Sequence, residues 1–256
     1  MLRTVQATRY VSPLREGGSV PALVEADDLG LYVVKLSGAA QGTKALVAEI
    51  VVGELARALA AAAPDLGLLV PEVVLVDLPR DLSVAEPDPE IQEHLAASAG
   101  LNVGLDFLPR ALPYVPAAGP QPSPELAAAI VWLDALGENV DRTPRNPNLL
   151  TWHDRVWLID HGAARYRQHA GLDPAKARGR FAAIRDHVLL PRAASIVDAD
   201  ARLAPLVTDD LVRRVVGLVP EPWLDAEAAA LHVDDLLARL RSPRDFVEEA
   251  EHARSA

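Results

Sequence analysis

Short runs of apolar and β-branched residues, separated by turn-forming residues, open the chain. They predict strands over residues 7–12, 20–25 and 31–36, with turns at residues 16–19 and 27–30. Residues 44–61 place apolar side chains around most of a helix circumference, which predicts a largely buried helix. Residues 66–78 predict a turn followed by a strand, and residues 103–108 predict one more strand. The first part of the chain is therefore expected to be a strand meander around one buried helix.

The apolar pattern changes to a helical period in the second part. Ser123 and Pro124 are typical of a helix start and predict a helix over residues 124–136. Two short apolar runs, 148–152 and 156–160, predict a hairpin, and helices are expected over 174–187, 209–216, 226–241 and 243–253. The polar stretch 79–100 is interpreted as a surface insertion with a short helix at 89–98, and the Pro-bearing stretch 109–124 as a connector. An α+β class follows.

The predicted hairpin places polar side chains together at its open end. Asp141 and Asn146 precede the first strand, and Asp160 closes the second. Because the ends of an antiparallel pair meet, we expect Asp160 to lie close to Asn146. Carboxylate and amide oxygens are suited to a hard cation such as Mg²⁺, which also binds substrate phosphates. The alternative is an ordinary hairpin with a polar turn.

A second candidate pair lies in the first part of the chain. In the strand 31–36 the period of two places Lys35 on the same face as Leu31 and Val33, so its ammonium needs a partner. Glu49 lies among apolar residues of the following helix, where an unpaired carboxylate would be costly, and is the expected partner. A structural salt bridge between strand and helix would explain the same pair.

Two glycine-containing stretches are candidate phosphate-binding loops. Gly17, Gly18 and Ser19 form a turn whose backbone N–H groups could approach a phosphate, although a plain hairpin turn explains the same residues. The stretch before Lys44 resembles a P-loop superficially, but its spacing does not match that motif, and we reject it.

Composition and charge exclude several classes of function. The net charge of -11 argues against a nucleic-acid-binding surface, so any phosphate site must be locally basic. The chain has no cysteine, which excludes disulfides and thiolate chemistry. No apolar run approaches 18 residues and the start lacks a signal-peptide core, so we expect a soluble cytoplasmic protein without membrane partners.

Taken together, these motifs resemble the HipA-like kinase family, over roughly residues 10–190. Asp141 followed five positions later by Asn146, and then Asp160 in Ile-Asp-His-Gly, is similar to the catalytic and metal-binding segments of the protein-kinase superfamily. Asn139 and Val140 stand where ordinary protein kinases have His and Arg, and Arg145 directly precedes Asn146. This variant also resembles the phosphatidylinositol-kinase branch.

The resemblance implies a two-lobed protein-kinase-like fold, with a nucleotide-binding N-lobe over residues 1–109 and a helical C-lobe over residues 110–256. It implies ATP and Mg²⁺ as cofactors. Asp141 would accept the proton of the attacking hydroxyl, Asn146 and Asp160 would hold Mg²⁺, and Arg145 or Arg142 would offset charge on the γ-phosphate. The nucleotide would be held by Lys35 with Glu49, by the loop of Gly17, Gly18 and Ser19, and at the adenine by the backbone of Asp106, Phe107 and Leu108.

The implied activity is transfer of the ATP γ-phosphate to a hydroxyl, with protein Ser or Thr favoured as the unknown acceptor. A lipid kinase of the phosphatidylinositol type, a small-molecule kinase and a non-catalytic pseudokinase that binds a partner are the alternatives. Ser12 and Ser19, near the glycine turn, are candidate self-phosphorylation sites. Residues from about 190 onward match no motif.

Overall fold

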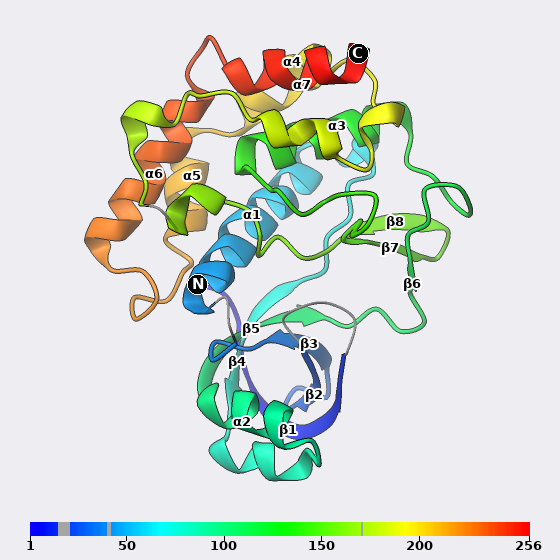
Figure 1. Cartoon of the computed structure of the whole chain (residues 1–256). Helices are drawn as coiled ribbons and strands as arrows, with labels where there is room; N and C mark the ends of the chain where they lie inside the picture. The colour runs from blue at the N-terminus through cyan, green and yellow to red at the C-terminus, as the bar shows by residue number, and fades with distance from the viewer. Residues whose placement is uncertain (15–20, 40–41, 170) are drawn as a thin grey trace.

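Five strands of the N-terminal part close into a barrel (Figure 1), in a computed structural model that describes residues 1–14, 21–39, 42–169 and 171–256. The barrel order is β1-β2-β3-β5-β4, and the closing pair, β1 with β4, is parallel. The antiparallel sheet expected from the sequence is thus a closed barrel with one parallel pair. Its strands are β1 (Thr4–Pro13), β2 (Ala22–Ala26), β3 (Leu31–Lys35), β4 (Val73–Leu78) and β5 (Gly100–Asp106).

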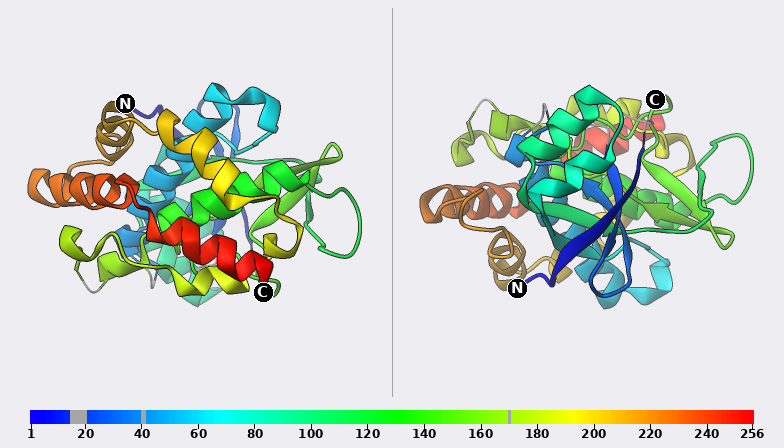
Figure 2. Two further views of the ribbon diagram at one scale, coloured as in Figure 1. Left: turned by 90° about the horizontal axis from the view of Figure 1, so that it is seen from above. Right: turned by 90° about the horizontal axis from the view of Figure 1, so that it is seen from below.

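Alternating residues of these strands fill the barrel. Val24, Val34 and Val76 are fully buried in its interior cluster. A Cβ at Gly104 would lie 2.5 Å from the Val76 side chain, so only glycine fits at this position of β5. Helix α2 (Pro89–Ala97) contributes Ile91 and Leu95 to the same cluster, and it lies across the outer end of the barrel (Figure 2, right). The segment interpreted as a surface insertion therefore closes the barrel.

Helix α1 (Gly42–Ala62) lies between the barrel and the helical remainder of the chain (Figure 1). Its apolar residues join the larger of the two core clusters, together with the residues of α3 (Pro124–Gly137). In β3, Val34 faces the barrel interior, while Val33 packs against the larger cluster. Since successive strand residues alternate, Lys35 lies on the same side of β3 as Val33, as its sequence position predicted.

The rest of the chain is mainly helical, with one small sheet of order β6-β7-β8. Its strands are β6 (Leu112–Pro113), β7 (Leu149–Trp152) and β8 (Arg155–Leu158). The remaining helices are α4 (Ile196–Leu203), α5 (Asp209–Val216), α6 (Ala226–Leu240) and α7 (Asp245–Ser255). Short 3-10 turns connect them: Pro64–Leu66, Arg80–Ala85, Tyr166–His169, Pro174–Lys176, Ala182–Asp186, Leu190–Arg192 and Ala204–Leu206. The mixed α+β class is confirmed.

One predicted helix is absent, and one helix of the structure was not predicted. The helix expected over 174–187 is broken into the 3-10 turns Pro174–Lys176 and Ala182–Asp186. Gly179 lies between them, and glycine is the weakest helix former after proline. Helix α4 was not predicted, although Ser195 caps its start by accepting a hydrogen bond from Asp198 N at 3.1 Å.

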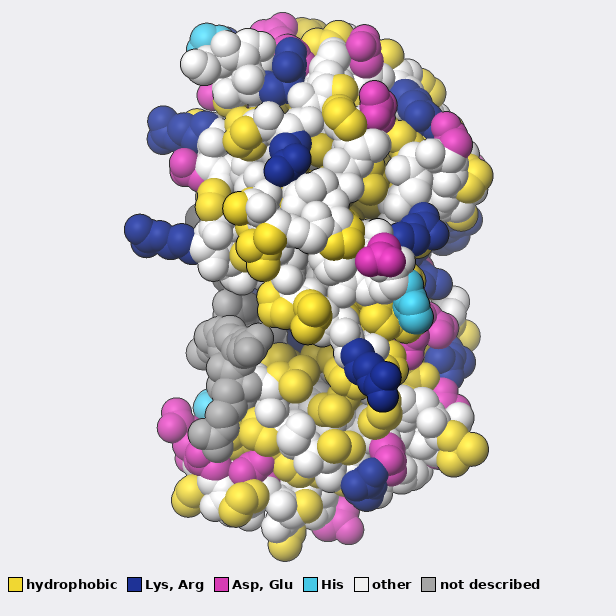
Figure 3. Space-filling model, turned by 90° about the vertical axis from the view of Figure 1, so that its right-hand side faces the viewer, with side chains coloured by type: hydrophobic (Ala, Val, Ile, Leu, Met, Phe, Trp, Pro, Cys, Tyr) yellow, Lys and Arg dark blue, Asp and Glu magenta, His cyan; other side chains and the backbone are white. Residues whose placement is uncertain are grey.

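Figure 3 shows how hydrophobic and charged side chains are distributed over one face of the molecule. Hydrophobic side chains gather across its middle, and Lys and Arg side chains are dispersed over it instead of forming one patch (Figure 3). Among the described residues, no helix is both long enough and apolar enough to cross a membrane.

Candidate active site

Three charged side chains from separate parts of the chain meet beside the barrel. Lys35 Nζ on β3 donates hydrogen bonds to Glu49 Oε2 on α1 and to Asp160 Oδ1 after β8, each at 2.5 Å. The Lys35 and Glu49 side chains are buried, whereas the Asp160 side chain is 38% exposed. The pairing predicted between Lys35 and Glu49 is present, and Asp160 joins it from 125 residues further along the chain.

The backbone after Asp160 reinforces this contact. Glu49 Oε2 accepts a second hydrogen bond, from His161 N at 2.8 Å, and Asp160 Oδ1 accepts one from Gly162 N at 3.3 Å. A Cβ at Gly162 would lie 3.3 Å from Lys35 Nζ, so a larger side chain there would press on the ammonium. Helix α1 is thereby tied to the end of the hairpin through one carboxylate.

The charges of this group determine its protonation. Burial would lower the pKa of Lys35, but the negative charges of Glu49 and Asp160 outweigh it and hold that pKa above its ordinary value. Burial would raise the pKa of Asp160, but the ammonium of Lys35 outweighs it and keeps that pKa below its ordinary value. For the fully buried Glu49, burial dominates and raises the pKa. One ammonium balances only one of the two carboxylates. The partly exposed Asp160 therefore carries negative charge where a ligand could reach it.

Neighbouring residues in the loop before β7 hold the side chain of Asp141 in place. Asn146 Nδ2 donates to Asp141 Oδ2 at 2.7 Å, and Asn148 Nδ2 donates to the same oxygen at 3.2 Å. Asp141 N in turn donates to Asn139 Oδ1 at 3.1 Å. Asp141 and Asn146, which the sequence predicted to act together, are therefore in direct contact, with Asn148 as a further partner.

Arg142 plays a different part from the one expected. It is 1% exposed, so it cannot face a phosphate in solution. Its guanidinium donates to Asp134 Oδ2, to the carbonyl oxygen of Asn148 and, at 3.2 Å, to the carbonyl oxygen of Ile159. Because those carbonyls lie before β7 and after β8, Arg142 joins the two ends of the hairpin.

Asp134 on α3 is the counter-ion of Arg142. Burial would raise the pKa of Asp134, but the charge of Arg142 and a hydrogen bond from His187 lower it far below the ordinary value. His187 Nε2 lies 2.9 Å from Asp134 Oδ2, and His187 Nδ1 accepts a hydrogen bond from Leu189 N. An Nδ1 that accepts cannot carry a proton, so His187 is the neutral tautomer with its proton on Nε2. The lowered pKa of His187, caused by burial, agrees with this assignment.

His161, which follows Asp160, packs inside the protein. It is 1% exposed, and burial together with the charge of Arg142 lowers its pKa to about 3. Its Nδ1 lies 3.4 Å from Arg142 Nη2. Within the described residues, no group of three or more His, Cys, Asp or Glu side chains could hold a metal ion. A cation at this site would depend on fewer protein ligands, which is the usual situation for Mg²⁺ with a phosphate substrate.

The segment predicted to meet adenine begins at the last residue of β5, Asp106. Asp106 N donates to Glu72 O at 3.0 Å, and Phe107 N donates to Leu31 O at 2.9 Å. Both amides are therefore occupied within the sheet. For Leu108 N, no backbone acceptor is found in the described part of the chain. Of the three predicted residues, Leu108 has the amide that is suited to a ligand.

The predicted site also includes the loop of Gly17, Gly18 and Ser19 and the side chain of Arg145. Gly17, Gly18 and Ser19 lie outside the described residues, so the structure does not place the predicted phosphate loop, and of the two candidate self-phosphorylation sites only Ser12, on β1, is placed. Arg145 is exposed beside Asn146, in contrast to the buried Arg142.

Comparison with known proteins identifies the family. The sequence pattern of the HipA-like kinases matches residues 8–244. The chain belongs to the HipA-like kinase family. The crystal structure of a Helicobacter pylori proinflammatory kinase, CtkA, is similar over 98% of both chains, with a TM-score of 0.57 and 12% sequence identity. At that identity the likeness shows a shared fold, and together with the family it supports a kinase-type phosphotransferase. No curated protein sequence matches the chain.

In this HipA-like kinase, several supporting residues were missed by reading the sequence. Asp134 lies inside the buried face of α3, and Asn148 and His187 lie in or next to apolar stretches. Each is a polar residue in an apolar context, which is the same signal that pointed to Glu49.

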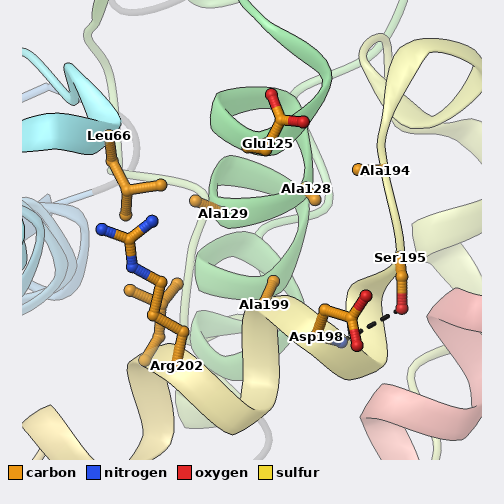
Figure 4. A pocket seen from close by; sticks show the side chains of 10 residues that line it. Leu66, Glu125, Ala128, Ala129, Ala194, Ser195, Asp198, Ala199 and Arg202 are labelled. Atoms are coloured by element: carbon orange, nitrogen blue, oxygen red, sulfur yellow. Dashed lines mark hydrogen bonds between the residues drawn. The ribbon is translucent and has the colours of Figure 1, made fainter.

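A hollow elsewhere in the molecule is unrelated to these contacts. It lies between α3 and α4 and is lined by Leu66, Ser195, Asp198 and Arg202 among others (Figure 4). Alanines form much of its floor, and Arg202 is engaged by Asp65. The residues that line it include none of the predicted site residues.

Proposed function

We propose that this HipA-like kinase transfers the γ-phosphate of ATP to a hydroxyl group with the help of Mg²⁺, and that the acceptor is a protein Ser or Thr. The observation that carries the proposal is the contact of Lys35 with both Glu49 and Asp160, because it joins the first part of the chain to the hairpin around a single ammonium. A salt bridge that served only to attach β3 to α1 would not need the third, partly exposed carboxylate.

The residues present fit a hard cation. Asp160 is the more exposed of the two carboxylates around Lys35, and Asn146 is exposed and uses only its amide nitrogen in its hydrogen bond to Asp141. The carboxylate of Asp160 and the side-chain oxygen of Asn146, Oδ1, would hold Mg²⁺. When bound, the ion would offset the negative charge of the phosphates.

The chain's own residues have separable tasks in the proposed reaction. Lys35 would bind phosphate oxygens, and Glu49 would keep its ammonium aimed into the site. Asp141, held by the two asparagine amides, would accept the proton of the acceptor hydroxyl as that oxygen forms its bond to phosphorus. The bond from the γ-phosphorus to the bridging oxygen breaks, and ADP leaves. The exposed Arg145 is positioned along the chain next to Asn146 and would offset charge on the transferred group.

The proposal includes a two-lobed arrangement, in which the nucleotide lies between the barrel with α1 and the helical part. The amide of Leu108, which follows β5 and has no backbone acceptor among the described residues, supports a contact with adenine at this place. A lipid or small-molecule acceptor, and a pseudokinase that binds a partner without turnover, remain the competing outcomes.

The experiment that tests the proposed function is calorimetric titration of the protein with ATP, with and without Mg²⁺, beside the variant Lys35→Met. Binding that Mg²⁺ strengthens, and that Lys35→Met weakens, is expected. Absence of ATP binding to the wild-type protein would overturn the proposal and leave the partner-binding function in its place.

A further inference from the structure

A second charged cluster connects the segments that precede and follow the β7–β8 hairpin to helix α6. We call the group formed by Arg165, Arg167, Glu138, Asp235 and Arg239 the α6 cluster, after the helix that carries Asp235 and Arg239. Four of the five residues are at most 2% exposed, and the Arg167 side chain is 19% exposed. Three guanidinium groups face two carboxylates, so every carboxylate is shared.

The cluster holds the segment that follows Asp160. Arg167 Nε donates to Glu138 Oε1 at 2.7 Å, and Arg167 Nη2 donates to Asp235 Oδ1 at 3.0 Å. Arg165 Nη2 lies 2.7 Å from Asp235 Oδ2, and Arg165 N donates to the carbonyl oxygen of Gly137. Two of the residues between 163 and 168 are thus bound to α6 through their side chains. The same segment also contacts α1, where Lys44 Nζ donates to Gln168 O at 3.0 Å.

The cluster also holds the loop that leads to Asp141. Glu138 ends α3 in the left-handed backbone conformation, with φ of 54°, three residues before Asp141. Besides binding Arg167, its carboxylate lies 3.3 Å from Arg239 Nη1. Arg239 reaches further, since its Nε and Nη2 donate to the carbonyl oxygens of Leu136 and Ala135 at 3.0 and 2.7 Å. One face of α6 therefore contacts both the end of α3 and the segment after Asp160.

Because the α6 cluster is buried, losing one partner of an ion pair in it would be costly. None of the Arg165 side-chain nitrogens makes a well-aligned hydrogen bond within the described residues, although the side chain is fully buried against Asp235. A buried guanidinium in this situation depends on the charge of its neighbour, because removing one partner of a buried ion pair is far more costly than the net contribution of the pair. Asp235, which pairs with two arginines, is the residue on which the cluster most depends.

We propose that Asp235 and Arg239 are positioning residues for catalysis: through Arg165, Arg167 and Glu138 they fix the loop before Asp141 and the segment after Asp160 in their relative places. Helix α6 is then part of the catalytic apparatus and not an appended covering helix. Its role in the transfer reaction rests on the proposed function, whereas its role in holding the two segments does not.

The neighbouring residues Asp234 and Asp235 offer a matched test. Asp235 is buried in the cluster and Asp234 is exposed on the same helix turn, so Asp235→Asn and Asp234→Asn make the same chemical change with and without the contacts. Hydrogen exchange by mass spectrometry is measured for both variants and for the wild-type protein. We expect Asp235→Asn to accelerate exchange roughly tenfold or more in peptides covering 137–142 and 160–168. Peptides from β3 and β5 should exchange as in the wild-type protein.

Other results would contradict the proposal. Exchange identical to that of Asp234→Asn, or faster exchange spread evenly over the barrel and all helices, would show that Asp235 does not hold these two segments in particular. If Asp235→Asn does not fold, Arg167→Gln carries the test with the same expectation, because its side chain is less buried. In phosphotransfer, Asp235→Asn should lose roughly tenfold or more in rate, while its affinity for ATP without Mg²⁺ stays within about threefold. An unchanged transfer rate would refute the catalytic role.

ATP titration of the wild-type protein separates this inference from the proposed function. Failure of the wild-type protein to bind ATP overturns the phosphotransfer proposal, and the exchange data still decide whether α6 holds the two segments.

Discussion

Glu49→Gln is the substitution that most sharply probes the contact of helix α1 with the hairpin. The Glu49 side chain is 0% exposed and accepts hydrogen bonds from Lys35 Nζ and from His161 N through the same oxygen. Glutamine has nearly the same volume and its amide oxygen can still accept hydrogen bonds, so the substitution removes the charge while it preserves the packing. Lys35 then keeps only Asp160 as a charged partner.

The size of the effect follows from the loss of charge assistance in the hydrogen bond from Lys35 to Glu49. A hydrogen bond to a charged group contributes about 1.5–3 kcal/mol. If Lys35 loses that much of its orientation toward bound phosphates, the affinity for ATP should fall by about 10- to 150-fold, since each 1.4 kcal/mol is tenfold. The expected change in affinity is therefore well above the error of a calorimetric titration.

The assay compares Glu49→Gln with Glu54→Gln on the same helix. Glu54 pairs with Arg57 and makes no contact with Lys35, so its substitution should change ATP affinity by less than about twofold. Thermal unfolding of both variants verifies that they are folded. Unchanged ATP affinity in a folded Glu49→Gln protein would contradict a role in ATP binding and show that the Lys35–Glu49 pair is a structural salt bridge.

Three further outcomes are expected. Asp160→Asn should remove most of the strengthening of ATP binding by Mg²⁺, which titration with and without the ion measures; an undiminished Mg²⁺ effect would place the ion elsewhere. Arg142→Ala should destabilise the fold by about 3–5 kcal/mol in chemical denaturation, because it leaves the buried carboxylate of Asp134 without its counter-ion, whereas Arg145→Ala at an exposed position of the same loop should cost less than about 0.5 kcal/mol. Burial lowers the pKa of His232 from 6.5 to about 4, so the unfolded chain binds this proton first, and stability should fall as pH falls from 6.5 to 4 by up to about 1.4 kcal/mol per pH unit. His232→Gln should flatten that dependence and His252→Gln, at an exposed position, should not; equal slopes in the two variants would contradict the assignment.

Local patterns in the sequence predicted most of the elements that carry the site. The hairpin and the buried helix α1 follow from apolar periodicity, and Lys35 and Glu49 were found because each is a charge in an apolar context. The contact of Asp160 with Lys35 joins residues 125 positions apart, so its geometry depends on how the barrel and the hairpin pack. Spacing along the chain could suggest that contact only through the family resemblance.

Arg142 shows where reading the sequence fails. Beside Asp141 in an exposed-looking polar loop, it has the same local context as Arg145, yet one is buried against Asp134 and the other is exposed. The difference comes from α3, whose Asp134 lies on a fully buried face and needs a counter-ion. The α6 cluster was missed for the same reason, because its carboxylates and arginines come from three separate segments.

Phosphotransfer that depends on Asp141 is tested by following labelled γ-phosphate from ATP. Wild-type protein and Asp141→Asn are incubated with Mg²⁺, labelled ATP and a protein extract, and the labelled residues are mapped by mass spectrometry. We predict label on Ser or Thr with the wild-type protein and a loss of about 10²–10⁴-fold with Asp141→Asn, whose ATP binding is retained. Equal labelling by the two proteins, or ATP binding by the wild-type protein without any transfer, would contradict the claim.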